Sequence, residues 1–325
     1  MAIQTTTTTT ALEEFQTNLR AAGLDAPWTR PGPLIPPKAT AVQARLWRWS
    51  AIEPLVRRTP EFMKPGRGAE RRILRLDNPG VPERTATHTI SVAVQYLLGG
   101  EVAPAHRHTP NAVRFMLHGE GAFTTIEGDK CVMRRGDLVI TPTMTWHDHG
   151  NDGAEPVMWT DGLDSPMVRY LENLHMDAYE GEQQPVRQGP PTRHVHYRWA
   201  DAYAELRRHA EGAADPFDDV IVEYQDPSTG RSVVPALGCY LQMLRPGVQG
   251  RAHWQTSSAV YHVVSGTGRT VVDGATFEWG EGDFFAVPPR AVHQHANPGS
   301  EPAILFSFQD VPLLKALGFY RTEAV

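Results

Sequence analysis

The chain is poor in cysteine and contains no long apolar segment. Only two of its 325 residues, Cys131 and Cys239, are cysteines, too few for the disulfide framework of a small secreted domain. No apolar run approaches the roughly 20 residues that a membrane-spanning helix needs. The start MAIQTTTTTT lacks the charged-then-apolar layout of a signal peptide. These absences predict a cytoplasmic protein that does not enter a membrane.

Basic clusters are also missing from the sequence. Lysine and arginine number 31 against 37 aspartates and glutamates, which gives a formal net charge of −6. A protein that binds nucleic acid or an anionic membrane surface normally concentrates positive charge in runs or along one face. We therefore expect a small-molecule ligand and no nucleic-acid partner.

Glycine, proline and histidine are abundant instead, at 28, 27 and 14 residues. Glycine and proline at this level indicate many turns and hence a β-rich chain. From about residue 70, short apolar runs bounded by turn residues predict strands: HTISVAVQYLL, AVRFMLHG, AFTTIEG, LVITP and PVMWT. Residues 199–210, WADAYAELRRHA, carry apolar residues at helical spacing and predict a helix.

The N-terminal segment has a different composition. The threonine run from Thr5 to Thr10 is of low complexity, and we expect it to be disordered. Thr10-Ala-Leu-Glu13 has the spacing of a capping box, which predicts that a helix begins there and ends at Gly23. The stretch PGPLIPPK that follows predicts extended chain.

The β-rich part of the chain is an internal repeat. GGEVAPAHRH matches RPGVQGRAHWQ, and RRGDLVITPTMTWHDHGN matches GEGDFFAVPPRAVHQHAN further along. His106 corresponds in this way to His253, and His147 to His293. The offset slips by a single residue over all matched positions, which indicates two copies of one β unit joined by a partly helical linker.

Three histidines of the first copy form a candidate metal site. His106 and His108 are two apart on a predicted strand and face the same side, and His147 follows about 40 residues later. Neutral imidazoles suit iron, zinc, copper or nickel, and three protein ligands leave coordination positions open for catalysis. The alternative is a set of buried, hydrogen-bonded core histidines, but three at this spacing favour a metal.

The second copy lacks part of this set. It keeps His253 and His293, but Gln255 replaces the second histidine and Tyr261 stands at the place of Arg114. A glutamine carbonyl replaces an imidazole poorly on a transition metal, so we expect a degenerate site there. For Arg114 two interpretations stay open: a clamp for an anionic ligand beside the metal, or a partner in an internal salt bridge.

The motif spacing carries a family resemblance. Gly-x5-His-x-His followed by Gly-x5-Pro-x4-His-x3-Asn resembles the two-part cupin signature, with Arg114 and its neighbours where many cupins have a glutamate ligand. Longer stretches, among them AERRILRLDNPG, VAVQYLLGGEVAPAHRHTPNAVRF, GDLVITPTMTWHDHGN, WTDGLDSP and ILFSFQDVPLLKALGFYR, are similar to the gentisate and salicylate 1,2-dioxygenases. This similarity runs from about residue 60 to the end of the chain.

The resemblance implies an all-β bicupin, in which two double-stranded β-helix (jelly-roll) barrels are preceded by a helical and extended arm and joined by a partly helical linker. The expected divisions are an N-terminal arm with one helix at residues 1–70 and a metal-binding cupin at 71–180. A linker with a helix at 181–218 and a degenerate cupin at 219–325 complete the chain. The family also implies a homotetramer, for which the proline-rich segment and the end KALGFYR are candidate exchange arms.

The resemblance further implies an Fe(II)-dependent oxidoreductase that breaks the C1–C2 bond of a 2-hydroxybenzoate with O2 and incorporates both oxygen atoms. Its iron ligands are His106, His108 and His147. The expected roles of the other site residues are substrate binding for Gln95, Arg114 and His149, proton transfer for His149, and orientation of a histidine for Asp161.

The resemblance does not identify the ring substituent of the substrate. Met144 and Thr160 stand where gentisate enzymes usually have Trp and Leu, so a 5-hydroxy, 5-nitro, 5-halo or unsubstituted salicylate, or a hydroxynaphthoate, stays open. Two other classes of function are kept as alternatives. They are a metal-dependent cupin isomerase or decarboxylase, and a non-catalytic cupin that binds a small molecule.

Overall fold

A computed structural model of the protein describes residues 3–33, 40–66 and 71–325. Contacts within the chain divide it into two units, Met1–Thr40 and Ala41–Val325. No helix in the described ranges is long and apolar enough to span a bilayer.

The first unit contains one long helix, α1 (Ile3–Ala21), which runs through the threonine run. The predictions of disorder and of a capping box at Thr10 are therefore wrong. Because Thr10 lies inside the helix, its neighbouring backbone N–H groups bond within the helix and need no cap. The end of the helix is as predicted, since Gly23 adopts the left-handed conformation that stops a helix (φ +70°). Most of PGPLIPPK lies outside the described residues.

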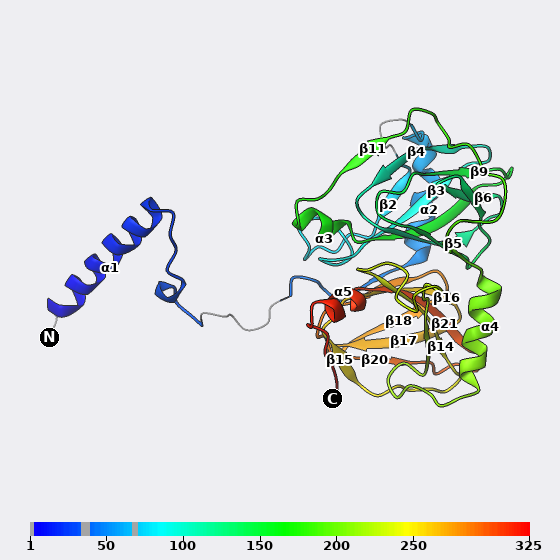
Figure 1. Cartoon of the computed structure of the whole chain (residues 1–325). Coiled ribbons are helices and arrows are strands. Elements are labelled where there is room, and N and C mark those ends of the chain that lie inside the picture. Colours follow the sequence, from blue (N-terminus) through cyan, green and yellow to red (C-terminus); the bar gives the residue numbers. More distant parts are fainter. Residues whose placement is uncertain (1–2, 34–39, 67–70) are drawn as a thin grey trace. The chain divides into compact units, whose positions relative to one another are not determined.

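The second unit holds two β repeats, and each repeat is built from two sheets (Figure 1). The sheets of the first repeat have the strand orders β12-β8-β5-β10-β3-β2 and β11-β4-β9-β6-β7. Their strands are β2 (Ile73–Arg75), β3 (Ser91–Leu97), β4 (Val102–His108), β5 (Ala112–His118), β6 (Ala122–Ile126), β7 (Asp129–Val132), β8 (Leu138–Thr141), β9 (His147–Asn151), β10 (Val157–Leu163), β11 (Met176–Ala178) and β12 (His196–Tyr197). Every apolar run that predicted a strand contains one.

The second repeat has the same plan, with the orders β1-β19-β16-β21-β14-β13 and β18-β17-β20-β15-β22. Its strands are β1 (Arg45–Trp47), β13 (Val220–Glu223), β14 (Gly238–Leu244), β15 (His253–Gln255), β16 (Ala259–Ser265), β17 (Thr267–Val272), β18 (Ala275–Gly280), β19 (Phe284–Val287), β20 (His293–Ala296), β21 (Ala303–Gln309) and β22 (Thr322–Ala324). The predicted all-β architecture of two jelly-roll units is confirmed. The end of the chain, considered above as an exchange arm, pairs through β22 with β15 of its own repeat.

Four helices accompany the strands of this unit: α2 (Trp49–Arg58), α3 (Ser165–Tyr170), α4 (Trp199–Ala210) and α5 (Val311–Ala316). The helix predicted at 199–210 is confirmed residue for residue. The prediction of a single helix in residues 1–70 is wrong, because α2 is a second one. Its residues Trp49, Ile52 and Val56 recur at helical spacing and pack against the core, which stabilises a helix that is short and begins without a side-chain cap.

The two repeats exchange their first strands. β1 precedes the first repeat but pairs with β19 of the second, whereas β12 precedes the second repeat but pairs with β8 of the first. The helix that follows each strand runs back toward the other repeat, so that α2 contacts β3 and α4 contacts β13 and β14 (Figure 1). Strand and helix together tie each repeat to its partner.

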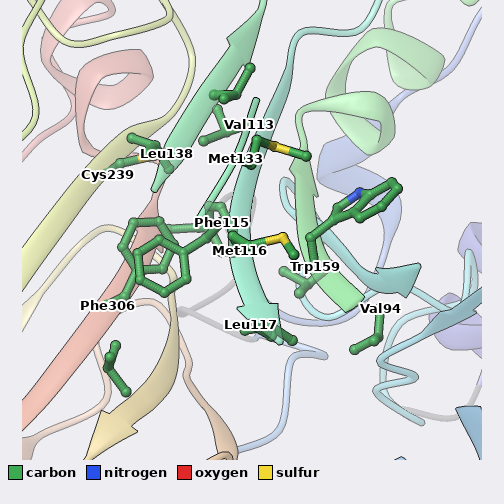
Figure 2. Close-up of a cluster of buried hydrophobic side chains, with 14 of the residues drawn as sticks. Val94, Val113, Phe115, Met116, Leu117, Met133, Leu138, Trp159, Cys239 and Phe306 are labelled. Atoms are coloured by element: carbon green, nitrogen blue, oxygen red, sulfur yellow. The ribbon is translucent and has the colours of Figure 1, made fainter. Parts of the chain in front are cut away.

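The main hydrophobic core is shared by both repeats. Phe115 of β5 stacks on Phe306 of β21 with ring centroids 4.1 Å apart. Figure 2 shows this pair beside Cys239, with Met116 and Trp159 on the other side of Phe115. One face of β5 therefore belongs to the contact between the repeats, while alternate residues of the same strand face the interior of the first repeat.

Candidate metal centre and active site

The three predicted metal ligands come together on two neighbouring strands. His106 and His108 project from β4, and His147 from β9, with His106 and His147 directly paired in the antiparallel ladder. The ring centroids of His106 and His147 are 4.2 Å apart, and those of His108 and His147 are 4.8 Å apart. The potential ligand atoms of all three lie within 4.8 Å of one another, so the group is able to hold a metal ion.

Backbone carbonyl groups orient each imidazole. The Nδ1 atoms of the three rings lie 3.1 Å, 2.7 Å and 2.9 Å from the carbonyl oxygens of Pro104, Pro110 and Thr145, for His106, His108 and His147 respectively. Because a carbonyl only accepts hydrogen bonds, we assign the proton of His108 and His147 to Nδ1, which leaves their Nε2 atoms free to bind a metal. Nε2 of His147 is buried and has no hydrogen-bond partner within the described ranges, as expected of an atom placed for a metal.

Burial keeps these imidazoles neutral. It lowers the pKa of His106 to about 2, with a further contribution from the positive charge of Arg71, and the pKa of His108 to about 4. The pKa of the fully buried His147 also lies well below its ordinary value. Neutral imidazoles bind a metal without first losing a proton, so the site needs no deprotonation at neutral pH.

A cavity of about 240 Å³ lies between the two sheets of the first repeat and reaches the histidines. The facing sheet contributes three predicted residues to its wall, Gln95 from β3, Arg114 from β5 and Asp161 from β10. His149 of β9 completes the wall beside His106 and His108. The structure therefore places six of the seven predicted site residues in the wall of one cavity, and the seventh, His147, lies against His106 and His108.

Arg114 is held from two sides and buried to 3% exposure. Its Nε lies 3.1 Å from Oδ1 of Asp161, and its Nη1 donates a short hydrogen bond to Thr141. Trp159 in turn donates to Oδ2 of Asp161 at 3.1 Å. Asp161 is thus the counter-charge of Arg114. This corrects the prediction that Asp161 orients a histidine, since the described residues include no such contact.

Arg114 therefore has features of both interpretations, the internal salt bridge and the clamp for an anionic ligand. The guanidinium group takes part in an internal ion pair and also lines the cavity. Burial raises the pKa of Asp161, and the positive charge of Arg114 opposes that rise. A buried arginine that keeps donors toward a cavity is suited to bind an anion there, because its fork presents several N–H groups in a plane.

His149 and Gln95 offer polar atoms to the same space. Nδ1 of His149 lies 2.9 Å from the hydroxyl oxygen of Thr124, and burial holds the pKa of this histidine well below its ordinary value. Nε2 of Gln95 is buried without a hydrogen-bond partner among the residues that the structure describes. Since leaving a buried amide N–H unpaired is costly, a ligand oxygen at this point would restore the lost hydrogen bond.

Sequence reasoning missed two cationic residues of the cavity, Arg71 and Arg75. Nη2 of Arg71 lies 2.7 Å from both the Pro104 carbonyl oxygen and Nδ1 of His106. The alternation of side chains along a strand could have identified both arginines. Because β2 pairs with β3, residues 71, 73 and 75 share the face of the sheet that carries Gln95. By contrast, Met144 and Thr160 do not line the cavity.

The equivalent place in the second repeat is not a preformed metal site. The rings of His253 and His293 keep a separation of 4.2 Å, but Gln255 is engaged by Gln309 at 3.4 Å and by the Tyr320 hydroxyl at 3.3 Å. In the described part of the chain, only the three histidines of the first repeat form a group able to hold a metal.

Comparisons with known proteins agree with this geometry. The family model "Cupin domain" matches residues 93–163 and 240–308, one match in each repeat. The chain is 39% identical to a 5-aminosalicylate 1,2-dioxygenase from Comamonas sp, over 86% of this chain and 81% of that protein. It is 35% identical to a gentisate 1,2-dioxygenase from Ralstonia sp, over 96% and 94% of the two chains.

The fold is similar to that of a solved enzyme along almost its whole length. A salicylate 1,2-dioxygenase from Pseudoaminobacter salicylatoxidans, in a crystal structure of its adducts with gentisate, superposes with a TM-score of 0.88. The sequences are 29% identical, and the superposition covers 97% of this chain and 94% of that one.

Proposed function

Because the chain belongs to the gentisate and salicylate 1,2-dioxygenase family, we propose that its first cupin holds Fe(II) through His106, His108 and His147 and opens a 2-hydroxybenzoate between C1 and C2. The chain is accordingly an oxidoreductase that cleaves the ring of a hydroxybenzoate with O2. One observation carries the assignment of the site: three carbonyl-oriented, neutral imidazoles converge beside a cavity that contains a buried arginine.

The residues present fit iron. Three imidazole nitrogens suit a divalent transition metal, and the unpartnered Nε2 of His147 is the kind of buried polar atom that a metal satisfies. When bound, Fe(II) would supply open coordination positions and the redox chemistry of O2. The remaining steps of binding and proton handling belong to the protein.

Arg114 and Gln95 are placed to hold the substrate carboxylate. Asp161 and Thr141 fix the guanidinium group before a ligand arrives, so little side-chain freedom is lost on binding. The unpartnered Nε2–H of Gln95 supplies a further donor. Together they restrict the rotation of the ring and keep C1 and C2 nearest the metal centre.

His149 is placed to accept the proton of the 2-hydroxyl group. The Thr124 hydroxyl donates to Nδ1 when the ring carries its proton on Nε2, and accepts from Nδ1 in the other tautomer. A neutral His149 with its proton on Nδ1 presents an unprotonated Nε2 to the cavity. This nitrogen takes up the phenolic proton. The buried position of the ring excludes bulk water from that transfer.

The test of this function is oxygen consumption by the reconstituted protein. Chain loaded anaerobically with Fe(II) should take up O2 on addition of gentisate, salicylate, 5-aminosalicylate, other 5-substituted salicylates or a hydroxynaphthoate, and should form a ring-opened product that contains both oxygen atoms. The relative rates assign the ring substituent. Absence of uptake with all of these compounds would remove the proposal.

The assembly and location of the enzyme complete the proposal. We expect a cytoplasmic homotetramer with a catalytic cupin at 71–180, a linker at 181–218 and a degenerate cupin at 219–325, as the family resemblance implies. The swapped strands β1 and β12 support a body in which both cupins act as one unit. Sedimentation at micromolar concentration tests the tetramer, and a monomer there would contradict it.

A further inference from the structure

A second cavity, of about 440 Å³, lies between the edge strand β7 and the segment that leads into α4. Positively charged and imidazole side chains dominate its wall: Lys130, Arg134, Arg193, His194, His196 and Arg198. No aspartate or glutamate lines it in the described structure. We call these six residues and the space between them the basic pocket. No motif brings the six together in the sequence, because they come from two separate segments.

Two of the six residues pair with acids outside the pocket. Lys130 pairs with Asp152 at 2.7 Å, and His196 with Asp137 at 2.9 Å. The guanidinium groups of three members have no hydrogen bond or ion pair to any described residue. They are those of Arg134, Arg193 and Arg198. Three unpaired positive charges around one cavity repel one another and create a positive potential that attracts anions.

The backbone that carries Arg193 and Arg198 is held in place. The backbone N–H and the hydroxyl group of Thr192 both donate to Oδ2 of Asp129 at 2.8 Å, and Nε of Arg187 donates to Oδ1 at 3.1 Å. At the other end of the segment, the N–H of Trp199 donates to Asp137 at 2.8 Å. An anion would therefore meet a wall that is ordered in advance, which lowers the entropic cost of binding.

The second cupin provides an internal comparison. The equivalent strand and helix, β1 and α2, dock on β19 in the same way, with the N–H of Trp49 donating to Asp283 at 2.8 Å. The places of Lys130, Arg134 and Arg193 are taken there by uncharged residues: Thr276, Gly280 and Gln43. The one retained arginine, Arg48, pairs with Asp283 at 2.9 Å. The fold thus forms without the basic charges, so packing does not explain their presence.

We propose that the basic pocket binds a small dianion, a group with the charge and size of a phosphate or of a short dicarboxylate. Two or more forked guanidinium groups match the paired oxygens of either anion. A dicarboxylate would be available from the reaction itself, because cleavage between C1 and C2 turns the hydroxyl-bearing carbon into a second carboxylate. This identification of the source rests on the proposed function, whereas the anion site does not.

Calorimetric titration of the full chain with inorganic phosphate at low ionic strength tests the site. The double variant Arg193→Ala/Arg198→Ala should bind phosphate at least tenfold more weakly than the wild type. The control Arg207→Ala/Arg231→Ala also removes two exposed, unpaired positive charges from elsewhere on the surface, and should stay within about twofold. Equal weakening in both double variants, or no binding by the wild type, would overturn the proposal.

Two further measurements locate the anion and identify its class. Crystals soaked in selenate should show an anomalous peak between Arg193 and Arg198, and a peak only in the histidine-lined cavity of the first cupin would contradict the proposal. Titration with succinate distinguishes the sources, since tighter binding of succinate than of phosphate assigns the site to a dicarboxylate and the reverse assigns it to phosphate. Because neither ligand needs iron or turnover, failure of the dioxygenase assignment would leave this result intact.

Discussion

The two cupins share their histidine geometry and differ in what surrounds it. The His106–His147 and His253–His293 ring pairs have the same centroid separation, 4.2 Å. The pair formed by His149 and Thr124 in the first cupin, at 2.9 Å, recurs as His295 and Thr270 at 2.8 Å in the second. The jelly-roll backbone therefore sets the positions of the imidazoles whether or not the cupin can hold a metal.

The surrounding residues reverse the electrostatics of the enclosure. Tyr261 and Tyr240 stand at the places of Arg114 and Ala93, Asp219 stands at the place of Arg71, and the neighbouring Asp218 lies 3.8 Å from Nε2 of His295. The first cupin thus has Arg71 and Arg114 in the wall of its cavity, whereas the second has bulky phenols and an acid at the matching places. The comparison teaches that two changes distinguish the cupins on a common backbone: the third imidazole is missing from the second cupin, and other residues surround the remaining pair.

The largest difference between the two cupins should appear in the iron content of their histidine variants. His106→Ala or His147→Ala removes one of three ligands and should abolish iron binding, while His253→Ala should leave about one iron per chain. Metal analysis of the three purified variants measures this. Iron retained after the first two changes, or lost after the third, would mean that the second cupin is the catalytic one.

A variant whose second cupin binds a metal ion without turning over substrate would sharpen the comparison of the two cupins. In the His106→Ala background, Gln255→His should complete a three-histidine group in the second cupin and restore about one metal ion per chain. Turnover should stay absent, because Tyr261 and Asp219 stand at the places of Arg114 and Arg71. Metal analysis and oxygen uptake on the same preparation decide the matter, and turnover in this variant would show that the imidazoles alone suffice.

Arg114 should account for a smaller, graded effect. Arg114→Lys keeps the charge and loses the fork, so kcat/KM should fall about tenfold to a hundredfold, since a charge-assisted hydrogen bond contributes roughly 1.5 to 3 kcal/mol. Arg114→Ala should lower it further, with unchanged iron content. Tyr261→Phe, the matched change in the second cupin, should leave kcat/KM within about twofold.

An arginine that served only the ion pair with Asp161 would behave differently. Its loss would leave a buried, unpaired carboxylate and lower Tm, because removing one partner of a buried pair costs about 3 to 5 kcal/mol. The folded fraction would then turn over normally. Measuring Tm, iron content and kcat/KM on the same Arg114→Ala preparation separates the two roles.

The smallest expected effect is a change in the pH dependence of protein stability, caused by Asp310. The carboxyl group of Asp310 accepts hydrogen bonds from the Thr89 hydroxyl at 2.5 Å and from the Ser258 N–H at 2.8 Å. Burial raises its pKa from 3.8 to about 6. A raised pKa in the folded state stabilises the protein below about pH 4, and that contribution is lost as the pH rises through 6. The loss is of the order of 3 kcal/mol.

Asp310→Asn cannot ionise and should lose this dependence. Unfolding measured by urea at several pH values should show the variant gaining stability relative to the wild type between pH 4 and pH 7. The matched change in the first cupin, Asp164→Asn, should act in the same direction because burial raises that pKa too. A difference that is constant with pH would show that Asp310 is ionised in the folded protein throughout.

The sequence was sufficient to predict the repeat, most strands and the three histidines that form a group able to hold a metal. Strand periodicity and the regular offset between copies are local signals, and His106, His108 and His147 lie within one copy. The partner of Arg114 was not predictable, because Asp161 is a neighbour only through the register of β5 and β10. Pairing between strands that are far apart in the chain produces no regular spacing of residues in the sequence.

The N-terminal errors have a different physical origin. Threonine has modest helix propensity, so the run before Leu12 gives no helical signal of its own, yet α1 extends through it. The helix α2 was missed because Pro54 lies inside it and the segment is short. In that case burial of its apolar face against the core outweighs a weak local preference.

The exchange of first strands has a consequence for the order of folding during synthesis. β1 leaves the ribosome before any residue of the second cupin, yet its sheet partner β19 is made close to the end of the chain. The first cupin therefore emerges with β1 unpaired, and closing that long loop should be a late and slow event. A nascent chain stalled after residue 218 would display an exposed strand, which gives holdase chaperones a binding site that the finished enzyme lacks.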